Sequence, residues 1–260
     1  MGTIQRSIMK IGIIVQARLG SNRLPGKTLM PIDSHGNVLE YVINQIKHNK
    51  HIKKIIVATT NNSEDDKIIP VTKKLQVDHF RGNSDDVLDR YYQCAKLFSL
   101  GIIVRITADN PLTDPQILDG AIEKFFHESP NYLSNVIERT FPFGTEIEIF
   151  DFSTLHSVWK NAKLPSEREH VTTYIRNNQQ KFKISHIKYK KNISNLRWTV
   201  DRKNDLDLIR LISTKIQNRP ILLNDILLLF KNEPELKKIN EANTPNEGHL
   251  KSLDSEKNYN

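Results

Sequence analysis

A short basic loop near the start of the chain has the composition of an anion-binding site. Residues 16–27 place three cations among small residues: Arg18, Arg23, Lys27, Gly20, Ser21 and Gly26. Arginine offers phosphate oxygens a planar pair of donors, lysine adds a mobile point charge, and exposed backbone amides also bind oxyanions. A polyphosphate is the simplest ligand that fits, and a solvated basic turn is the alternative. The loop is neither a Walker A nor a Gly-x-Gly-x-x-Gly sequence, which disfavours an ATPase or a dinucleotide-binding protein.

Two aspartates follow strand-like runs far apart in the chain. Asp109 comes after residues 102–106, and Asp201 comes after residues 196–200. Open α/β folds bind ligands at the carboxyl ends of their strands, so we expect both carboxylates beside the basic loop. Mg²⁺ prefers oxygen ligands and commonly takes only one or two protein carboxylates beside phosphate oxygens. The pair therefore predicts a magnesium site, unless Asp109 caps a turn and Asp201 caps the following helix.

Alternating strand and helix patterns predict the scaffold that holds these residues. In the first half, strands are expected at 11–15, 55–58, 77–80 and 102–106, and helices at 38–48, 63–75, 85–98 and from Asp114 onward. In the second half, strands are expected at 147–150, 182–187 and 196–200, and helices at 152–161 and 203–215. The alternation predicts a three-layer, doubly wound α/β fold with a mostly parallel mixed sheet. Pro70 should kink or shorten its helix.

The length of 260 residues fits one large domain or at most two small ones, and we place a single domain at residues 8–231. Residues 1–7 are expected to be flexible, and residues 232–260, which are rich in Asn, Glu, Lys and Ser, to be a disordered tail.

The longest apolar runs fall far short of the roughly 20 residues that span a bilayer. A single cysteine, Cys94, suits a reducing cytoplasm. The net charge of +8 is spread over several lysine clusters, which favours solvated surfaces over a nucleic-acid interface.

Five ordered segments connect these features to a known family. The run IIVQARLGSNRLPGKTL resembles the signature of the CMP-sugar synthetases, in particular the cytidylyltransferase branch that includes the spore-coat polysaccharide protein SpsF. The same branch is matched, in order, over roughly residues 10 to 215 by FRGNSDDVLDRYY, VRITADNPLTDP, LPSEREHVTTYIR and LRWTVDRKNDLDL. The resemblance implies a nucleotide-diphospho-sugar transferase-like fold and a homodimer.

The resemblance also implies roles for individual residues. The nucleotide-binding set is Gln16, Ala17, Arg18, Gly20, Ser21, Arg23, Lys27, Arg81 and Thr107, with Lys27, Arg18 and Arg23 as catalytic cations. Asp109 and Asp201 are the implied magnesium ligands. The acceptor-binding set is Glu146, Glu148, Glu167, Arg168 and His170, and a structural role in a helix is the alternative for His170. The branch usually has Gly-Leu-Asp where this chain has Gly144-Thr145-Glu146, so its carboxylate extends further into the site.

These implications predict an enzyme that transfers CMP from CTP to a sugar acid or a phosphorylated sugar-like acceptor. Pyrophosphate would be released, and the product would serve surface polysaccharide or glycoconjugate biosynthesis. A nucleotide-sugar-dependent glycosyltransferase of related fold is one alternative, and it would consume a preformed nucleotide sugar instead. A non-catalytic protein that binds nucleotides or nucleic acid is the other, suggested by the sequence pI of about 9.4 and distinguished by steep loss of binding with salt.

Overall fold

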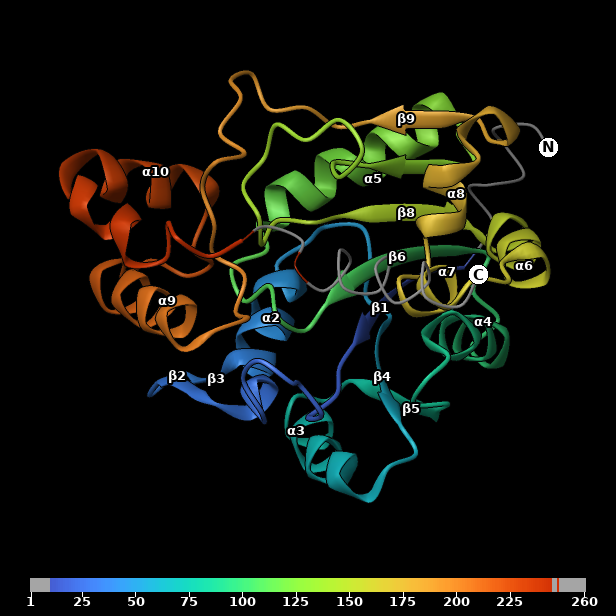
Figure 1. Cartoon of the computed structure of the whole chain (residues 1–260), viewed down its shortest axis with the longest axis horizontal. Coiled ribbons are helices and arrows are strands. Elements are labelled where there is room, and N and C mark those ends of the chain that lie inside the picture. The colour runs from blue at the N-terminus through green and yellow to red at the C-terminus, as the bar shows by residue number, and fades with distance from the viewer. Residues whose placement is uncertain (1–9, 245–246, 248–260) are drawn as a thin grey trace.

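The computed structural model describes residues 10–244 and residue 247 (Figure 1). Its centre is a seven-stranded sheet in the order β5-β4-β1-β6-β8-β7-β9. The strands are β1 (Ile11–Gln16), β4 (Ile55–Thr60), β5 (Asp78–Gly82), β6 (Ile102–Thr107), β7 (Tyr132–Ser134), β8 (Glu148–Asp151) and β9 (Ile184–His186). Only β8 runs antiparallel to its neighbours, β6 and β7. The predicted mostly parallel mixed sheet is confirmed.

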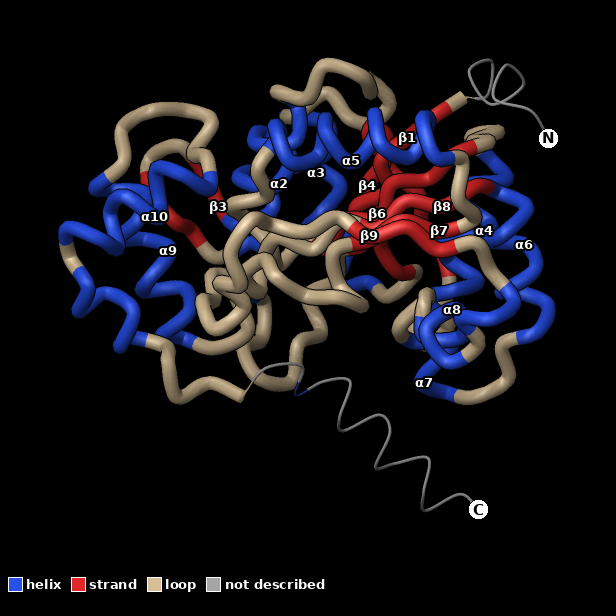
Figure 2. The backbone as a smooth tube through the Cα atoms, turned by 90° about the horizontal axis from the view of Figure 1, so that it is seen from above, coloured by secondary structure: helices blue, strands red, loops and turns tan. Residues whose placement is uncertain are grey.

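Helices cover both faces of this sheet (Figure 2). They are α2 (Val38–Lys47), α3 (Ile68–Lys74), α4 (Val87–Leu97), α5 (Pro115–Glu128), α6 (Phe152–Asn161), α7 (Pro165–Glu169), α8 (Thr173–Asn177), α9 (Lys203–Lys215) and α10 (Leu223–Asn232). The alternating side chains of the strands divide the core. Ile13 and Val15 of β1 pack with α2 and α5, whereas Ile14 packs with α4 and α6. This period-two alternation gives the three layers that the sequence predicted.

A third apolar cluster lies beside the sheet, where α9 and α10 gather at one end of the molecule (Figure 1). It joins Trp198, Ile209 and Phe230 to Val38 and Tyr41 of α2. The hairpin of β2 (Pro31–Asp33) and β3 (Gly36–Asn37) leads into α2, and α9 packs along β2. The second half of the chain is thereby fastened to the first.

Local signals explain where several helices begin. Asn37 accepts from the Glu40 amide and the Glu40 carboxylate accepts from the Asn37 amide, which closes a capping box at the start of α2. Asp114 caps α5, and Pro115 occupies its first turn as predicted. Pro70 also lies in a first turn, because a 3-10 segment, η2 (Ser63–Lys67), precedes α3. Proline is tolerated there, since the first-turn N–H groups have no helical partner.

The strand predicted at 196–200 is wrong. This extended segment makes only an isolated bridge, between Arg197 and Phe143, and joins no sheet among the described residues. It is instead fastened by backbone bonds, Trp198 N–H to Phe143 O at 2.8 Å and Val200 N–H to Asp109 O at 2.8 Å. Gly144 permits the close approach, because a Cβ there would lie 2.5 Å from the Thr199 nitrogen, and its φ of 103° favours glycine.

The domain boundary predicted after residue 231 is also too early. A 3-10 segment, η4 (Pro234–Ile239), follows α10 and inserts Leu236, which is 6% exposed, into the third apolar cluster. Asn240 is 3% exposed and hydrogen-bonded. The sequence did not predict this packing, because the segment is mostly polar and has few apolar residues. Residues 1–7 and most of the predicted tail beyond residue 244 lie outside the described residues. Among the residues that the structure describes, no helix is long and apolar enough to cross a membrane.

Cys94 should be inert in the folded protein. Its thiol is buried within α4, and burial raises the pKa of Cys94 to about 12. Because the thiolate is the reactive form, we expect no reaction with Ellman's reagent at pH 8 until denaturant is added. Stoichiometric labelling of the native protein, followed at 412 nm, would contradict the burial of this side chain.

Candidate active site

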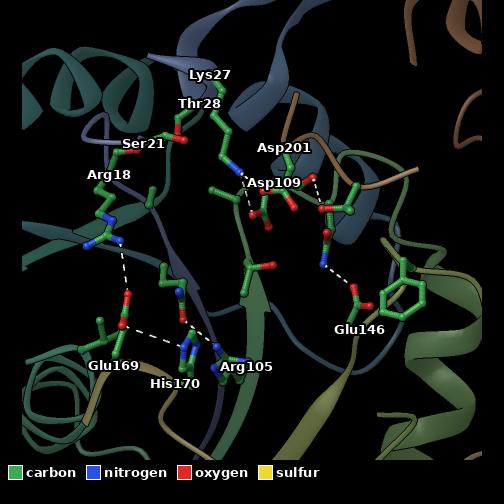
Figure 3. Close-up of a pocket in the computed structure, with 18 of the residues that line it drawn as sticks. Arg18, Ser21, Lys27, Thr28, Arg105, Asp109, Glu146, Glu169, His170 and Asp201 are labelled. Atoms are coloured by element: carbon green, nitrogen blue, oxygen red, sulfur yellow. Dashed lines mark hydrogen bonds and ion pairs between the residues drawn. The ribbon is translucent and has the colours of Figure 1, made fainter. Parts of the chain in front are cut away.

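A pocket of about 600 Å³ opens at the carboxyl ends of β1 and β6. The basic loop forms one wall, the chain after β6 and the 197–201 segment form another, and residues from 139 to 176 close the far side. Figure 3 shows Lys27, Asp109 and Asp201 grouped in one part of the pocket, with Arg105, Glu169 and His170 in another. The structure therefore brings together residues that lie far apart in the sequence.

Lys27 lies between the two predicted metal-binding aspartates. Its ammonium donates to Asp109 Oδ2 at 2.9 Å, to Asp201 Oδ1 at 2.8 Å and to the Val200 carbonyl at 2.6 Å (Figure 3). Burial lowers the pKa of Lys27, but the carboxylates of Asp109 and Asp201 outweigh burial and raise it above its ordinary value. The ammonium is therefore a fixed positive charge at neutral pH.

Asp201 is held by three cations. Besides Lys27, Arg23 Nη2 lies 2.5 Å from Asp201 Oδ1, and Arg197 Nη2 lies 2.9 Å from Asp201 Oδ2. Burial raises the pKa of Asp201, but Lys27 and then Arg23 outweigh it and hold this pKa well below its usual range. The carboxylate is therefore ionised at any physiological pH.

The two aspartates meet as predicted, but for a different reason. Asp109 does follow β6, whereas Asp201 follows a segment outside the sheet. Its position comes from the Val200 N–H, which donates to the Asp109 carbonyl, and from the Thr199 hydroxyl, which donates to the same carbonyl at 3.2 Å. Backbone pairing beside Asp109 thus takes the place of a shared strand edge.

The donor chemistry of this centre suits a hard divalent cation. Asp109 and Asp201 each keep part of their side chain open to solvent, at 29% and 19% exposure. Within residues 10–244 and residue 247, no cluster of three or more His, Cys, Asp or Glu could hold a metal by itself. Two carboxylates would leave the remaining positions to substrate oxygens, which is how Mg²⁺ is commonly bound.

Most of the predicted nucleotide-binding residues line the pocket, namely Gln16, Ala17, Arg18, Ser21, Arg23, Lys27 and Thr107. Main-chain groups of two of these residues are engaged within the protein, since the Ala17 N–H donates to the Ala58 carbonyl and the Gln16 carbonyl accepts from the Ala108 amide. The Gln16 side chain instead accepts from Arg105 at 3.0 Å.

Two predicted nucleotide-binding residues lie outside the pocket lining. Gly20 faces η2, because a Cβ there would lie 2.9 Å from Glu64 Oε1. Arg81 binds the Thr60 carbonyl at 2.9 Å and the Asn62 carbonyl at 2.9 Å, so its guanidinium fastens the loop after β4.

The predicted acceptor residues divide in the same way. Glu146, Glu148 and His170 line the pocket, whereas Glu167 and Arg168 have scaffolding contacts. Glu167 accepts from the Lys163 amide at 3.0 Å near the start of α7, and Arg168 Nε donates to Asp86 Oδ2 at 2.9 Å. Neighbouring residues of a short helix point in different directions, and the sequence motif does not show which of them face the pocket.

Several polar or charged pocket residues were not predicted from the sequence. Arg105, Asn110, Glu169 and Arg176 stand inside the quoted motifs, whereas Arg139 lies outside them. Arg105 pairs with the buried carboxylate of Glu148, and burial of Glu148 is outweighed by Arg105 and Arg176, so its pKa stays below its ordinary value. Arg105 could have been recognised from the sequence, because a charged residue within an otherwise apolar strand is unusual.

Two of the arginines that line the pocket form no ion pair among the described residues. The other lysine and arginine side chains that line it pair with carboxylates: Arg18, Arg23, Lys27, Arg105, Arg139 and Arg197. In the described part of the chain, Arg90 and Arg176 have no carboxylate oxygen within 4.0 Å. Arg90 is 1% exposed; its Nη1 donates to the Asn83 carbonyl at 2.6 Å, and its Nε has no partner in the described part of the chain. Arg176 Nη2 donates to the Thr172 and Thr173 hydroxyls, at 3.4 and 3.5 Å.

A sequence profile of the family described as cytidylyltransferase matches residues 12–233. The chain belongs to the cytidylyltransferase family. The solved structure of a cytidylyltransferase from Leptospira borgpetersenii is 34% identical to it and superimposes with a TM-score of 0.86, covering 91% of this chain and 98% of that one.

Curated relatives agree with this membership. The spore coat polysaccharide biosynthesis protein SpsF of Bacillus subtilis is 28% identical over 88% of this cytidylyltransferase and 97% of its own length. A 3-deoxy-manno-octulosonate cytidylyltransferase of Solibacter usitatus is 28% identical over 53% of each chain. The family and its type of reaction, nucleotidyl transfer, are therefore as the sequence motifs predicted.

Proposed function

We propose that this cytidylyltransferase transfers CMP from CTP to an acidic, sugar-like acceptor and releases pyrophosphate. The observation that carries the proposal is Arg176, a cation that lines the pocket and forms no ion pair with a carboxylate in the described part of the chain. Arg176 is half-buried, and its Nε has no hydrogen-bond partner among the described residues. A polar group that is buried without a partner costs free energy, so an anionic group of the substrate is the natural partner. A sugar acid such as the one named for the Solibacter usitatus relative, or a phosphorylated sugar, supplies that group.

The residues around Lys27 supply the electrostatic part of the reaction. An acceptor oxygen attacks the α-phosphorus of CTP, the bond to the β-phosphate oxygen breaks, and the acceptor proton leaves to solvent. Lys27, Arg23 and Arg18 face the phosphates and offset the negative charge that develops, a contribution that depends on preorganisation. Asp109 and Asp201 would hold magnesium, which neutralises phosphate charge and lowers the pKa of a bound hydroxyl.

The residues at the far side would orient the acceptor. Glu148 accepts from Tyr132, Thr172 and Arg105, so its carboxylate is fully engaged and serves to position Arg105. Glu146 is likewise held by Asn110 at 2.9 Å and Arg139 at 2.7 Å. Arg176 is then the group best placed to bind an acceptor anion.

A substrate screen tests the proposal. CTP and UTP are each combined with sugar acids, sugar phosphates and neutral sugars, with pyrophosphate release as the readout. We expect release only with CTP and an acidic acceptor. Consumption of a preformed nucleotide sugar without pyrophosphate would establish the glycosyltransferase alternative instead. The polysaccharide pathway suggested by SpsF, a cytoplasmic location and a homodimer belong to the same proposal, and light scattering tests the last.

Replacing Arg176 with glutamine should weaken acceptor binding selectively. A hydrogen bond to a charged group contributes about 1.5–3 kcal/mol, so the acceptor KM should rise roughly 10- to 100-fold while the KM for CTP stays within about twofold. Arg210→Gln is the matched control, because Arg210 lies on α9 and binds the Pro31 carbonyl away from the pocket. An unchanged acceptor KM in Arg176→Gln would remove this residue from the acceptor site.

A further inference from the structure

Asp205 is the buried residue on which the position of Asp201 depends. It is 0% exposed at the start of α9. Its Oδ2 accepts the backbone N–H of Asp201 at 3.0 Å and that of Arg202 at 3.0 Å. Its Oδ1 accepts from Arg197 Nε at 3.0 Å, and Nη2 of the same guanidinium reaches Asp201 Oδ2 at 2.9 Å. Asp205 therefore fixes both the backbone and the carboxylate of Asp201.

The chain after η4 completes the contacts of Asp205. Asn240 Nδ2 donates to Asp205 Oδ1 at 2.8 Å and to the Arg197 carbonyl at 3.1 Å. Asn243 Nδ2 donates to the same Asp205 oxygen at 2.9 Å and to Asn204 Oδ1 at 2.9 Å. Further along, Glu247 pairs with Arg202 at 2.8 Å and lines the pocket. Two asparagines from the end of the described chain thus bind the residue that holds Asp201.

We propose that Asn240 and Asn243 are positioning residues for the transfer reaction, acting through Asp205 and Arg197 on Asp201. They lie beyond residue 233, where the match to the family profile ends. The inference rests on the proposed function, because Asp201 matters only if it serves the phosphate-binding centre.

The hydrogen bonds to the Asp205 carboxylate explain why loss of either asparagine would affect the transfer reaction. A buried carboxylate needs several donors, and Asp205 shares Arg197 with Asp201. Without the two amides, Asp205 Oδ1 keeps only Arg197 Nε among the described residues. The guanidinium would be drawn toward Asp205 and away from Asp201. The expected result is a displaced Asp201 carboxylate in a protein that still folds around its apolar clusters.

The test compares Asn240→Ala and Asn243→Ala with Leu236→Ala in the full chain. Leu236 belongs to the same segment and packs in the third apolar cluster, and none of the hydrogen bonds that hold Asp205 in the described chain comes from it. We expect each asparagine variant to lower kcat at least fivefold and to weaken Mn²⁺ binding in the presence of CTP, measured by electron paramagnetic resonance without acceptor. Leu236→Ala should lower Tm at least as much but keep parental Mn²⁺ binding and kcat.

A second comparison, made with a double variant, distinguishes a positioning role from a general loss of stability. In an Asp201→Asn background, Asn243→Ala should weaken Mn²⁺ binding no further, because coupled residues are not additive. Parental Mn²⁺ binding in both asparagine variants, or equal losses in Leu236→Ala, would overturn the proposal. Because Mn²⁺ binding is measured without acceptor, an error in the proposed reaction would leave these differences in place, whereas an error in the positioning role would abolish them.

Discussion

Replacing Lys27 with alanine should lower turnover about 100- to 1000-fold, the range observed when one preorganised donor to a transition-state charge is removed. Lys27 is the cation that contacts both Asp109 and Asp201, and its raised pKa keeps it charged. Its loss removes positive charge from the phosphate side of the pocket and frees two carboxylates. Initial rates of pyrophosphate release measure the effect.

The Lys27→Ala protein should still fold, because Arg23 and Arg197 continue to neutralise Asp201. Circular dichroism and Tm check this. Lys203→Ala is the matched control, since Lys203 has a side chain that is 82% exposed and pairs only with Asp207 among the described residues. Near-parental rates for both Lys27→Ala and Arg18→Ala would exclude the basic loop from the mechanism.

The first half of the fold was predictable because its signals are local. Buried strands such as β1 and β6 are predominantly apolar runs, and Asp114 with Pro115 marks a helix start that the structure confirms. The second half depends on contacts between distant residues. β7 has three residues, too few for a periodic pattern, and the 196–200 segment is extended only because Phe143 and Asp109 pair with it.

The candidate site was predictable only in part. Lys27, Asp109 and Asp201 meet as expected, although Asp201 follows an extended segment outside the sheet and not a strand. Arg81 was misplaced because β5 directs it toward the Thr60 and Asn62 carbonyls. Arg176 was missed because nothing in its local sequence distinguishes an arginine that faces a pocket from one that faces water. Only the assembled structure shows which cations lack carboxylate partners.

Asp109→Asn and Asp201→Asn should share one phenotype, because both carboxylates are proposed to hold the same cation. Each substitution keeps the side-chain shape and removes one negative charge. Loss of outer-shell partners alone reduces metal affinity about 10- to 100-fold, so losing a direct ligand should raise the magnesium requirement by at least about tenfold. Asp201→Asn should also lower Tm more than Asp109→Asn, since Asp201 pairs with Lys27, Arg23 and Arg197 whereas Asp109 pairs with Lys27.

A magnesium titration of the parent and both variants, read as pyrophosphate release from CTP, tests the shared centre most directly. The half-saturating magnesium concentration should rise in both variants, with part of the lost rate restored at high magnesium, and Mn²⁺ binding in the presence of CTP should weaken in parallel. A parental magnesium dependence in Asp201→Asn, beside a shifted one in Asp109→Asn, would contradict the shared site and leave Asp201 a structural ion-pair residue.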